Sequence, residues 1–247
     1  MVIVFVRRIE NLSDAEKQNI ISSLSSSALK RLESKRNKGL YNASLCALSL
    51  LSDVQRAALD YADGGRPFFK DLDADISISH SASYTAVALS DSWENPVGID
   101  IEDIPYISNN EEQPENVPPC VKGAAAKRLR DCPTRFLTEN ERLALEGGTP
   151  YLNIWTKKEA LFKFLKNDST PFIHLDSTAP ELHGAKFVTV AVLDGTVSML
   201  TQSSMREYGT SLPCVKGGSE EQGEGIVSQA FLTVCTSTNQ LVKIIEK

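Results

Sequence analysis

The alternation of apolar and polar residues along the first hundred positions predicts both strands and helices. A helical stretch begins at Ser13, and a basic helical stretch covers residues 28–38. The small, apolar residues from Tyr41 to Leu51 predict a core helix that continues toward Leu59. The strands predicted in this half cover residues 1–6, 75–79, 85–89 and 97–102.

The second half has the same order of helices followed by strands. Thr138 and Glu141 fit a capping box at a helix start, because each side chain can bond the backbone N–H of the other residue. A further helix is predicted from Tyr151 to about Lys166, and residues 214–225 are predicted to form a Gly/Glu-rich loop. The strands predicted here cover residues 186–193, 197–201 and 231–235. This order predicts an α+β fold made of two similar halves.

A proline-rich segment separates the two halves. Residues 105–121 hold four prolines and neither lysine nor arginine. We therefore divide the chain into an N-terminal α+β half (residues 1–104), an acidic Pro-rich linker (residues 105–121) and a C-terminal α+β half (residues 122–247).

Composition narrows the classes of function. The chain has 247 residues, 41% of them hydrophobic, which is enough for a packed core. Its net charge of −6 argues against a surface that binds nucleic acid or anionic lipid. The five cysteines are widely spaced and contain no Cys-x-x-Cys pair, which favours a reducing compartment over a zinc ribbon or a disulfide framework. With no apolar stretch long enough for a membrane helix or a signal peptide, we expect a cytoplasmic protein.

Two carboxylates are the first candidate for chemistry. Asp100 and Glu102 lie two residues apart on a predicted strand, so their side chains leave the same face while Ile99 and Ile101 leave the other. Eight acidic residues and no lysine or arginine occur in residues 91–121, so no local cation is available. The pair is either an exposed strand edge with solvated carboxylates or a site for a hard cation such as Mg²⁺.

A second cluster lies on the predicted helix after Tyr151. Trp155, Glu159 and Lys163 follow one another at spacings of four residues and share one face. One interpretation is a core tryptophan beside an ordinary Glu159–Lys163 ion pair. The other is that Glu159 is a third carboxylate for the same metal and Lys163 a point charge for a phosphate.

The turn after the strand at residues 75–79 carries the third candidate, Ser79 and His80. His80 is either a structural, hydrogen-bonded imidazole or an anion contact. Arg66 and the cations of residues 30–38 make a polyanionic ligand reasonable. The residues by themselves therefore favour a metal-assisted site for a phosphorylated ligand.

Five stretches occur in the order and approximate spacing of one known family. They are Gly65-Arg-Pro67, Ile76-Ser-Ile-Ser-His80-Ser, Val97-Gly-Ile-Asp-Ile-Glu102, Phe136-Leu-Thr-Glu-Asn-Glu141 and Trp155-Thr-Lys-Lys-Glu-Ala-Leu-Phe-Lys163. Through them the chain resembles the Sfp-like 4′-phosphopantetheinyl transferases. The third and fifth stretches are the specific part of the resemblance.

The resemblance implies a monomer of two similar α/β halves in a pseudo-twofold arrangement, with coenzyme A between them and Mg²⁺ on its diphosphate. The metal ligands it implies are Asp100, Glu102 and Glu159. The residues it implies for binding coenzyme A are Arg66, Ser79, His80, Asp100, Lys158 and Lys163.

The activity that the resemblance implies is transfer of the 4′-phosphopantetheine arm of coenzyme A to a serine of an apo acyl or peptidyl carrier protein, with release of adenosine 3′,5′-bisphosphate. Glu159 would take the serine proton and Lys163 would stabilise charge on the leaving group. An anionic carrier needs a basic surface to dock on. For that surface we select Lys122, Lys127, Arg128 and Arg130.

The chain departs from the family pattern at two places. The helix at residues 42–48 has no arginine, and no glycine follows Lys163 before Pro171. Two other functions stay open: a relative that only binds coenzyme A or carrier protein, and an unrelated Mg²⁺-dependent phosphohydrolase. The chain lacks the Gly-rich phosphate loop expected of many phosphohydrolases.

Overall fold

The computed structural model describes residues 1–104, 134–166, 170–193, 196–199, 229–237 and 239–247. The predicted linker (residues 105–121), the basic residues selected for carrier docking (Lys122, Lys127, Arg128 and Arg130) and the predicted loop (residues 214–225) lie outside the described residues. No helix in the described part is long and apolar enough to cross a membrane.

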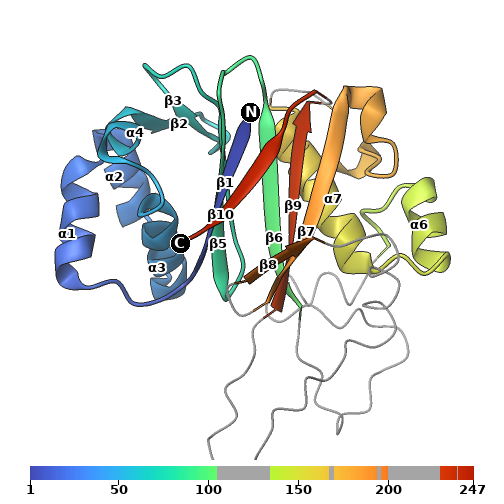
Figure 1. Ribbon diagram of the computed structural model, residues 1–247, viewed down its shortest axis with the longest axis horizontal. Helices are drawn as coiled ribbons and strands as arrows, with labels where there is room; N and C mark the ends of the chain where they lie inside the picture. Colours follow the sequence, from blue (N-terminus) through green and yellow to red (C-terminus); the bar gives the residue numbers. More distant parts are fainter. Residues whose placement is uncertain (105–133, 167–169, 194–195, 200–228, 238) are drawn as a thin grey trace, which may run out of the picture.

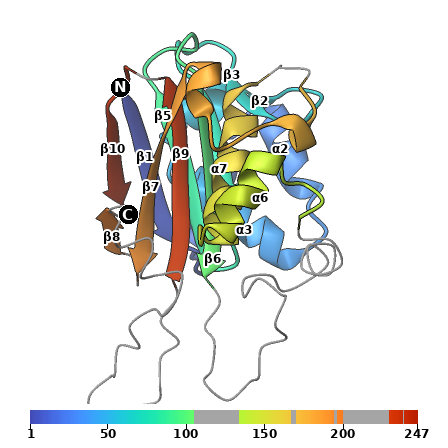
Figure 2. The same ribbon diagram turned by 90° about the vertical axis from the view of Figure 1, so that its right-hand side faces the viewer.

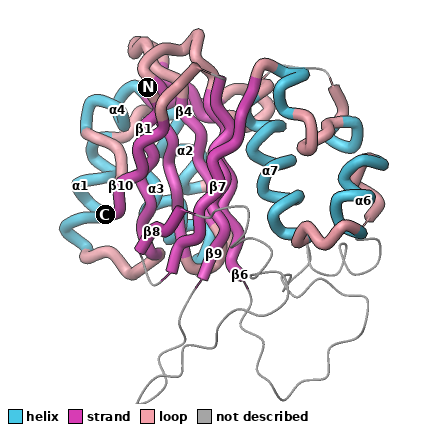
Figure 3. Tube along the Cα trace, turned by 45° about the vertical axis from the view of Figure 1, so that its right-hand side comes forward, coloured by secondary structure: helices cyan, strands magenta, loops and turns pink. Residues whose placement is uncertain are grey.

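Two four-stranded sheets pack face to face, with helices on the outer side of each (Figures 1 and 3). Helices α1–α4 cover the first sheet, and α7, with α6 beyond it, covers the second. This arrangement confirms the predicted α+β class. The pseudo-twofold relation of the halves stays a prediction.

The first sheet has the strand order β10-β1-β5-β4. Its strands are β1 (Val2–Arg8), β4 (Ile76–His80), β5 (Tyr84–Ser90) and β10 (Val242–Glu246). Strand β5 pairs antiparallel with both β1 and β4, whereas β10 pairs parallel with β1. A separate two-stranded sheet joins β2 (Leu59–Tyr61) to β3 (Pro67–Phe69).

The second sheet has the order β6-β9-β7-β8 and is antiparallel throughout. Its strands are β6 (Val97–Ile104), β7 (Ala185–Leu193), β8 (Thr196–Met199) and β9 (Gln229–Ser237). In Figure 2 β10 and β8 lie at the same side of the molecule, away from α7.

The two predicted halves exchange strands. Strand β6, at the end of the predicted N-terminal half, pairs with β9 in the second sheet. Strand β10, at the C-terminal end of the chain and absent from the sequence-based prediction, pairs with β1 in the first sheet. Hydrogen bonds therefore connect the two halves in both directions, and the proposed domain division stays a prediction.

The core between the sheets follows the period-two alternation of their strands. Val2, Val4 and Val6 of β1 meet Ile99 and Ile101 of β6 there, all almost fully buried. The other face of the first sheet packs on the helices α1 (Asp14–Ser23), α2 (Ser26–Glu33), α3 (Lys38–Leu48) and α4 (Asp53–Ala58).

The basic stretch at residues 28–38, predicted as one helix, is divided between α2 and α3. Helix α2 ends at Glu33, with Ser34 as its C-cap, and α3 begins after Asn37, whose side chain accepts a hydrogen bond from the Leu40 N–H and caps that helix. The predicted capping box of α6 (Glu139–Glu146) is confirmed, with Thr138 and Glu141 bonded to each other's backbone N–H. Helix α7 (Tyr151–Phe164) also lies where it was predicted, and two short 3₁₀ turns (Phe172–His174 and Pro180–His183) follow it.

Gly98 sets how closely α7 approaches β6. A Cβ atom at this position would lie 1.9 Å from the Ala160 carbonyl oxygen and 2.6 Å from the Phe164 nitrogen. Only a residue without a side chain allows this contact. Because Asp100 follows Gly98 by two residues and Glu159 adjoins Ala160, the close approach also brings the candidate site residues together.

We expect Gly98→Ala to destabilise the fold by about 3 kcal/mol, because the added methyl group forces the backbones of β6 and α7 apart. Urea unfolding monitored by circular dichroism measures the loss. Gly64→Ala is the matched control, since a Cβ there meets no atom within 4 Å. Equal stability of the two variants would contradict this account of the α7–β6 contact.

Candidate active site

Strands β4 and β6 belong to different sheets and are connected by side chains of β4 and of Asp75, the residue directly before it. Val97 N–H donates to Asp75 Oδ2 at 2.8 Å, and Ile99 N–H donates to Ser77 Oγ at 3.1 Å. Ser79 Oγ then donates to Asp100 Oδ1 at 2.9 Å. Along these three contacts the residue numbers increase both on the β4 side and on the β6 side, so the two strands run in the same direction. We call these contacts the β4–β6 junction.

The alternation in residues 75–79 produces this junction. Residues two apart on a strand leave the same face, so the three polar side chains at 75, 77 and 79 all reach β6. The apolar Ile76 and Ile78 turn instead toward α1–α4. The sequence pattern predicted the strand but gave no signal that its polar face would hold another strand.

Lys163 of α7 closes the junction. Its Nζ donates to Asp100 Oδ1 at 2.7 Å, to the Ile99 carbonyl at 3.0 Å and to Ser79 Oγ at 3.2 Å. Among the described residues, Lys163 forms its ion pair with Asp100 rather than with Glu159. The i,i+4 ion pair considered from the sequence is therefore wrong.

The other two candidate carboxylates, Glu102 and Glu159, feel the charges of both Lys163 and Asp100. Burial, followed by the neighbouring Asp100 carboxylate, raises the pKa of Glu102 to about 8. Burial also raises the pKa of Glu159; Lys163 opposes this shift and Asp100 adds to it. Glu102, Glu159 and Asp100 thus share one region with the ammonium group of Lys163. With a pKa of about 8, the Glu102 carboxyl holds a proton at neutral pH.

The chemistry of these donors suits a hard divalent cation. Asp100 Oδ2 is buried and has no hydrogen-bond partner among the residues that the structure describes. A buried carboxylate oxygen without a partner is costly, and a cation would satisfy it. In the described ranges, however, no three Asp, Glu, His or Cys side chains already stand as a ready metal-binding group. A bound cation would therefore have to draw Glu102 and Glu159 toward Asp100.

His80 lies at the end of β4, next to the junction. Burial lowers its pKa, and the positive charges of Lys35 and, more weakly, Lys163 lower it further. The imidazole is therefore neutral at pH 7, and the ammonium groups of Lys35 and Lys163, opposed by the Asp100 carboxylate, act on it. Lys35 follows α2, which brings one of the cations of residues 30–38 to the site. Arg31 instead stacks on Tyr61, 4.5 Å from the ring centre.

Arg66 supports the junction from the opposite end. Its guanidinium donates to Asp75 Oδ2 at 3.0 Å, to the Val97 carbonyl at 3.3 Å and to the carbonyl of Lys163. The described contacts thus make Arg66 a link between β4, β6 and the end of α7. A contact of Arg66 with coenzyme A stays a prediction.

Lys166 occupies the turn in which the family pattern has a glycine. Its φ of 55° lies in the left-handed region, which costs energy for a residue with a side chain. The side chain donates to the Trp93 carbonyl at 2.7 Å and pairs with Asp75 Oδ1 at 3.3 Å. These contacts compensate for the backbone conformation, so the missing glycine has a structural substitute.

Lys158 does not face the candidate site, and its prediction as a coenzyme A contact is wrong. The side chain is fully buried and donates to Glu141 Oε2 at 2.8 Å and to the Leu175 carbonyl. Glu141 Oε1 also accepts from Ser177 N–H at 2.9 Å. Lys158 and Glu159 are adjacent on a helix, so their side chains point about 100° apart. One enters the core between α6 and α7, and the other faces β6.

Sequence reasoning missed Asp75, Lys166 and the role of Glu141 beyond its helix cap. Asp75 and Lys166 lie outside the recognised motifs, and only their meeting in space connects them. Glu141 did carry a signal, because it and Lys158 both belong to stretches that resemble the family.

A comparison with known families finds a match in the part of the chain that contains the three candidate carboxylates. Residues 96–208 match the family described as the 4′-phosphopantetheinyl transferase superfamily. The matched region includes Asp100, Glu102, Glu159 and Lys163, whereas Arg66, Ser79 and His80 precede it. No curated protein matches the chain. Residues 96–208 therefore form a domain of the 4′-phosphopantetheinyl transferase superfamily.

Proposed function

We propose that this protein is an Sfp-like 4′-phosphopantetheinyl transferase that is active with Mg²⁺. It transfers the arm of coenzyme A to a serine of an apo carrier protein and releases adenosine 3′,5′-bisphosphate. The observation that carries the proposal is the Asp100–Lys163–Ser79 cluster, in which Asp100 Oδ2 is buried without a partner in the described residues. Helices on the outer face of each sheet also agree with the two-halved architecture proposed for this type.

The reaction exchanges one bond to phosphorus for another. The oxygen of the carrier serine forms a bond to the β-phosphorus of coenzyme A. The bond from that phosphorus to the bridging oxygen breaks, and this oxygen leaves on adenosine 3′,5′-bisphosphate. Positioning and charge stabilisation are the main contributions a protein makes to such a transfer.

Asp100, Glu102 and Glu159 would hold the metal ion, and Mg²⁺ in that position would neutralise charge on the diphosphate oxygens. Asp100 is already fixed by Ser79 and Lys163 through Oδ1, which leaves Oδ2 for the ion. Burial and the neighbouring Asp100 carboxylate raise the pKa values of Glu102 and Glu159, and a bound cation would oppose these shifts.

Glu159 is the proposed acceptor of the serine proton. Burial raises the pKa of the Glu159 carboxyl, and a bound cation would lower it again and keep the carboxylate ionised, as a proton acceptor must be. Its position on α7, one turn before Lys163, lies on the same face as the ammonium group. A base and a cation on one helix face suit this transfer, because the serine oxygen loses a proton while the bridging oxygen that leaves gains negative charge.

Lys163 is the proposed partner of the leaving phosphate. Its ammonium group has three donors, and all three bond protein atoms. A phosphate oxygen must therefore replace one of them, and the bond to Ser79, at 3.2 Å, is the longest. His80, beside it, is proposed to contact the 3′-phosphate together with Lys35.

The first prediction concerns transfer itself. Incubation with coenzyme A, Mg²⁺ and a panel of apo acyl and peptidyl carrier proteins should add one phosphopantetheine unit to a carrier, detected by intact-mass spectrometry. EDTA should suppress the gain. Glu159→Gln should lower the rate by about 100-fold or more, since it removes the proton acceptor and a metal ligand. Glu139→Gln, a substitution of an exposed glutamate on α6, should leave the rate unchanged.

Coenzyme A binding without any mass gain would favour the relative that only binds, and release of free phosphate would favour the phosphohydrolase. Near-normal turnover of Glu159→Gln with Mg²⁺ would show that the metal and base assignments are wrong.

The second prediction concerns pH and Mg²⁺ together. Because the folded protein raises the pKa of Glu102 to about 8, above the value of an exposed glutamate, the folded state holds more protons and loses stability as pH rises from about 4.5 to 8. A cation that binds the ionised carboxylates offsets this loss. We expect about 10 mM Mg²⁺ to raise the thermal midpoint more at pH 8 than at pH 6.

Calorimetry with KCl of matched ionic strength is the control for salt. Asp100→Asn should abolish the Mg²⁺-dependent gain, whereas Asp14→Asn, at a fully exposed position, should keep it. A gain that is equal in wild type and Asp100→Asn would contradict the proposed ligand set.

The third prediction concerns His80. An anion beside an imidazole favours its charged form, so binding of adenosine 3′,5′-bisphosphate should raise the lowered pKa of His80. NMR titration of the histidine ring resonances measures it, with His80→Gln for assignment. The resonances of His174 and His183 are internal controls. Ligand binding with no change in the titration of His80 would remove this residue from the proposed phosphate contacts.

A further inference from the structure

The C-terminal end of α7 is held by a residue from the other predicted half of the chain. Carbonyl groups in the last turn of a helix have no partner within it, and Lys163, the last residue but one of α7, carries one of them. Arg66, 97 positions earlier, donates from its guanidinium to this carbonyl. A positive charge there also opposes the partial negative charge of a helix C-terminus. Arg66 therefore caps α7 at the residue whose ammonium group belongs to the candidate site.

The guanidinium of Arg66 connects three segments at once. Besides the Lys163 carbonyl, it bonds Asp75 Oδ2 at 3.0 Å and the Val97 carbonyl, at the start of β6, at 3.3 Å. The planar fork of an arginine fixes the angles between such bonds, whereas a lysine ammonium group is a point charge on a flexible stem. These contacts therefore depend on the shape of arginine as well as on its charge.

Asp75 fixes the position of Arg66. Its side chain is 5% exposed, accepts from Arg66 and from the Val97 N–H, and pairs with Lys166. Its backbone N–H donates to Ser90 Oγ at 3.1 Å, and its carbonyl accepts from the Ser90 N–H at 3.0 Å. A buried carboxylate needs its partners, so movement of Arg66 toward a ligand would take one of its two cations from Asp75.

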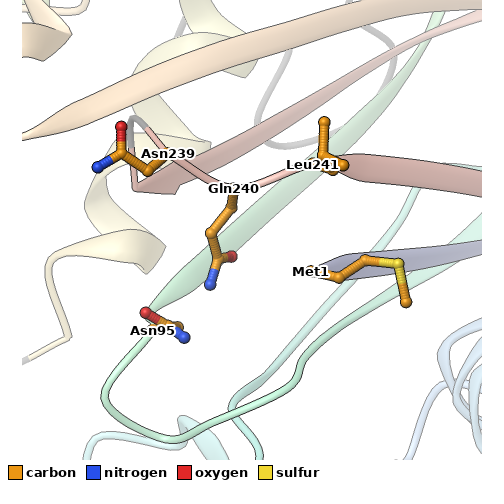
Figure 4. A pocket seen from close by; sticks show the side chains of 5 residues that line it. All are labelled: Met1, Asn95, Asn239, Gln240 and Leu241. Atoms are coloured by element: carbon orange, nitrogen blue, oxygen red, sulfur yellow. The ribbon is translucent and has the colours of Figure 1, made fainter.

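Lys166 attaches the end of α7 at a second point. Its Nζ donates to the Trp93 carbonyl at 2.7 Å, and the Trp93 N–H in turn donates to Asp73 Oδ1 at 2.9 Å. From Trp93 the chain passes Asn95, at the pocket shown in Figure 4, and enters β6. Lys166 therefore fastens the end of α7 to the segment that leads into the strand of the acidic residues.

These contacts hold Lys163 at both of its ends. Its main chain is bonded to Arg66, and its ammonium group is bonded to Asp100 at 2.7 Å. Rotations within the four-carbon stem let the ammonium group exchange Ser79 for a phosphate oxygen, provided that the main chain keeps its place. A misplacement of about 1 Å can lower a rate by about 100-fold, so the position of the helix end matters for transfer.

We propose that Arg66 is a positioning residue for Lys163. Its guanidinium caps α7 at the Lys163 carbonyl and, with Asp75 as counter-ion, sets where the Lys163 ammonium group lies at the β4–β6 junction. The role rests on the proposed function, in which Lys163 is the partner of the leaving phosphate. Arg66 then acts through Lys163 and makes no contact of its own with coenzyme A.

The test measures transfer and ligand binding in the full chain. Arg66→Gln should lower kcat about tenfold, while the Kd of adenosine 3′,5′-bisphosphate, measured by calorimetry, changes by less than about twofold. Arg66→Lys keeps the charge and loses the fork, so it should lower kcat to a similar extent. Arg66→Gln combined with Asp75→Asn should be no slower than the slower single variant, because both substitutions remove the same interaction.

Hydrogen exchange followed by NMR reports the cap without any activity. The Leu165 N–H bonds the Leu161 carbonyl at 3.0 Å in the last turn of α7, whereas the Ile154 N–H bonds the Pro150 carbonyl in the first turn. In Arg66→Gln we expect the Leu165 amide to exchange about tenfold faster and the Ile154 amide to exchange as in wild type, because only the capped end frays.

Arg56→Gln is the matched control. Arg56 is 5% exposed, donates to the carbonyls of Leu48 and Leu51 at and just after the end of α3, and pairs with Asp53. The contact is of the same type, at a helix that carries no candidate site residue. Arg56→Gln should therefore lower the thermal midpoint at least as much as Arg66→Gln and leave kcat unchanged.

Three results would overturn the proposal. A Kd of adenosine 3′,5′-bisphosphate that rises about tenfold in Arg66→Gln, with unchanged exchange of the Leu165 amide, would make Arg66 a ligand contact. Wild-type kcat in Arg66→Gln or Arg66→Lys would remove the role of the fork, and an equal loss of kcat in Arg56→Gln would reduce the effect to general stability. Absence of transfer by the wild-type protein would instead refute the proposed function, and the exchange of Leu165 would still decide whether Arg66 caps α7.

Discussion

The ion pair between Lys163 and Asp100 is the contact on which the candidate site depends. It joins α7 to β6, and through Ser79 it joins both to β4, so one ammonium group connects the two sheets and a helix. The geometry requires Gly98, because only a strand without a side chain at that position lets α7 approach closely enough. This arrangement leaves Asp100 Oδ2 buried without a hydrogen-bond partner among the described residues, which costs free energy. Such a cost is typical of a site that awaits a ligand.

Different faces of α7 have different roles. Lys158 enters the core and holds Glu141, which fixes α6 against the helix. Trp155 packs with Tyr151 and Phe172 and fixes the helix from another side. With the helix held by these contacts, Glu159 and Lys163 face β6 in a defined orientation. A buried ion pair is a weak source of net stability, and its value here lies in fixing which side of the helix faces the carboxylates.

Strand exchange ties the two halves into one structure. Strand β6 belongs by sequence to the first half and by hydrogen bonding to the second sheet, while β10 does the reverse. The candidate site lies where β6 meets β4, at the boundary between the sheets.

The sequence by itself determined the local features. It predicted β1, β4–β6, the capping box at Thr138 and the extent of α7, because strand alternation and helix capping depend on residues within a few positions of one another. It also predicted that Asp100 and Glu102 share a face opposite Ile99 and Ile101. Tertiary structure alone decided that Lys163 pairs with Asp100, that Lys158 is buried with Glu141, and that β10 pairs with β1. Lys163 and Asp100 are 63 positions apart, and no local spacing or propensity specifies a contact over such a separation; packing of the whole chain does.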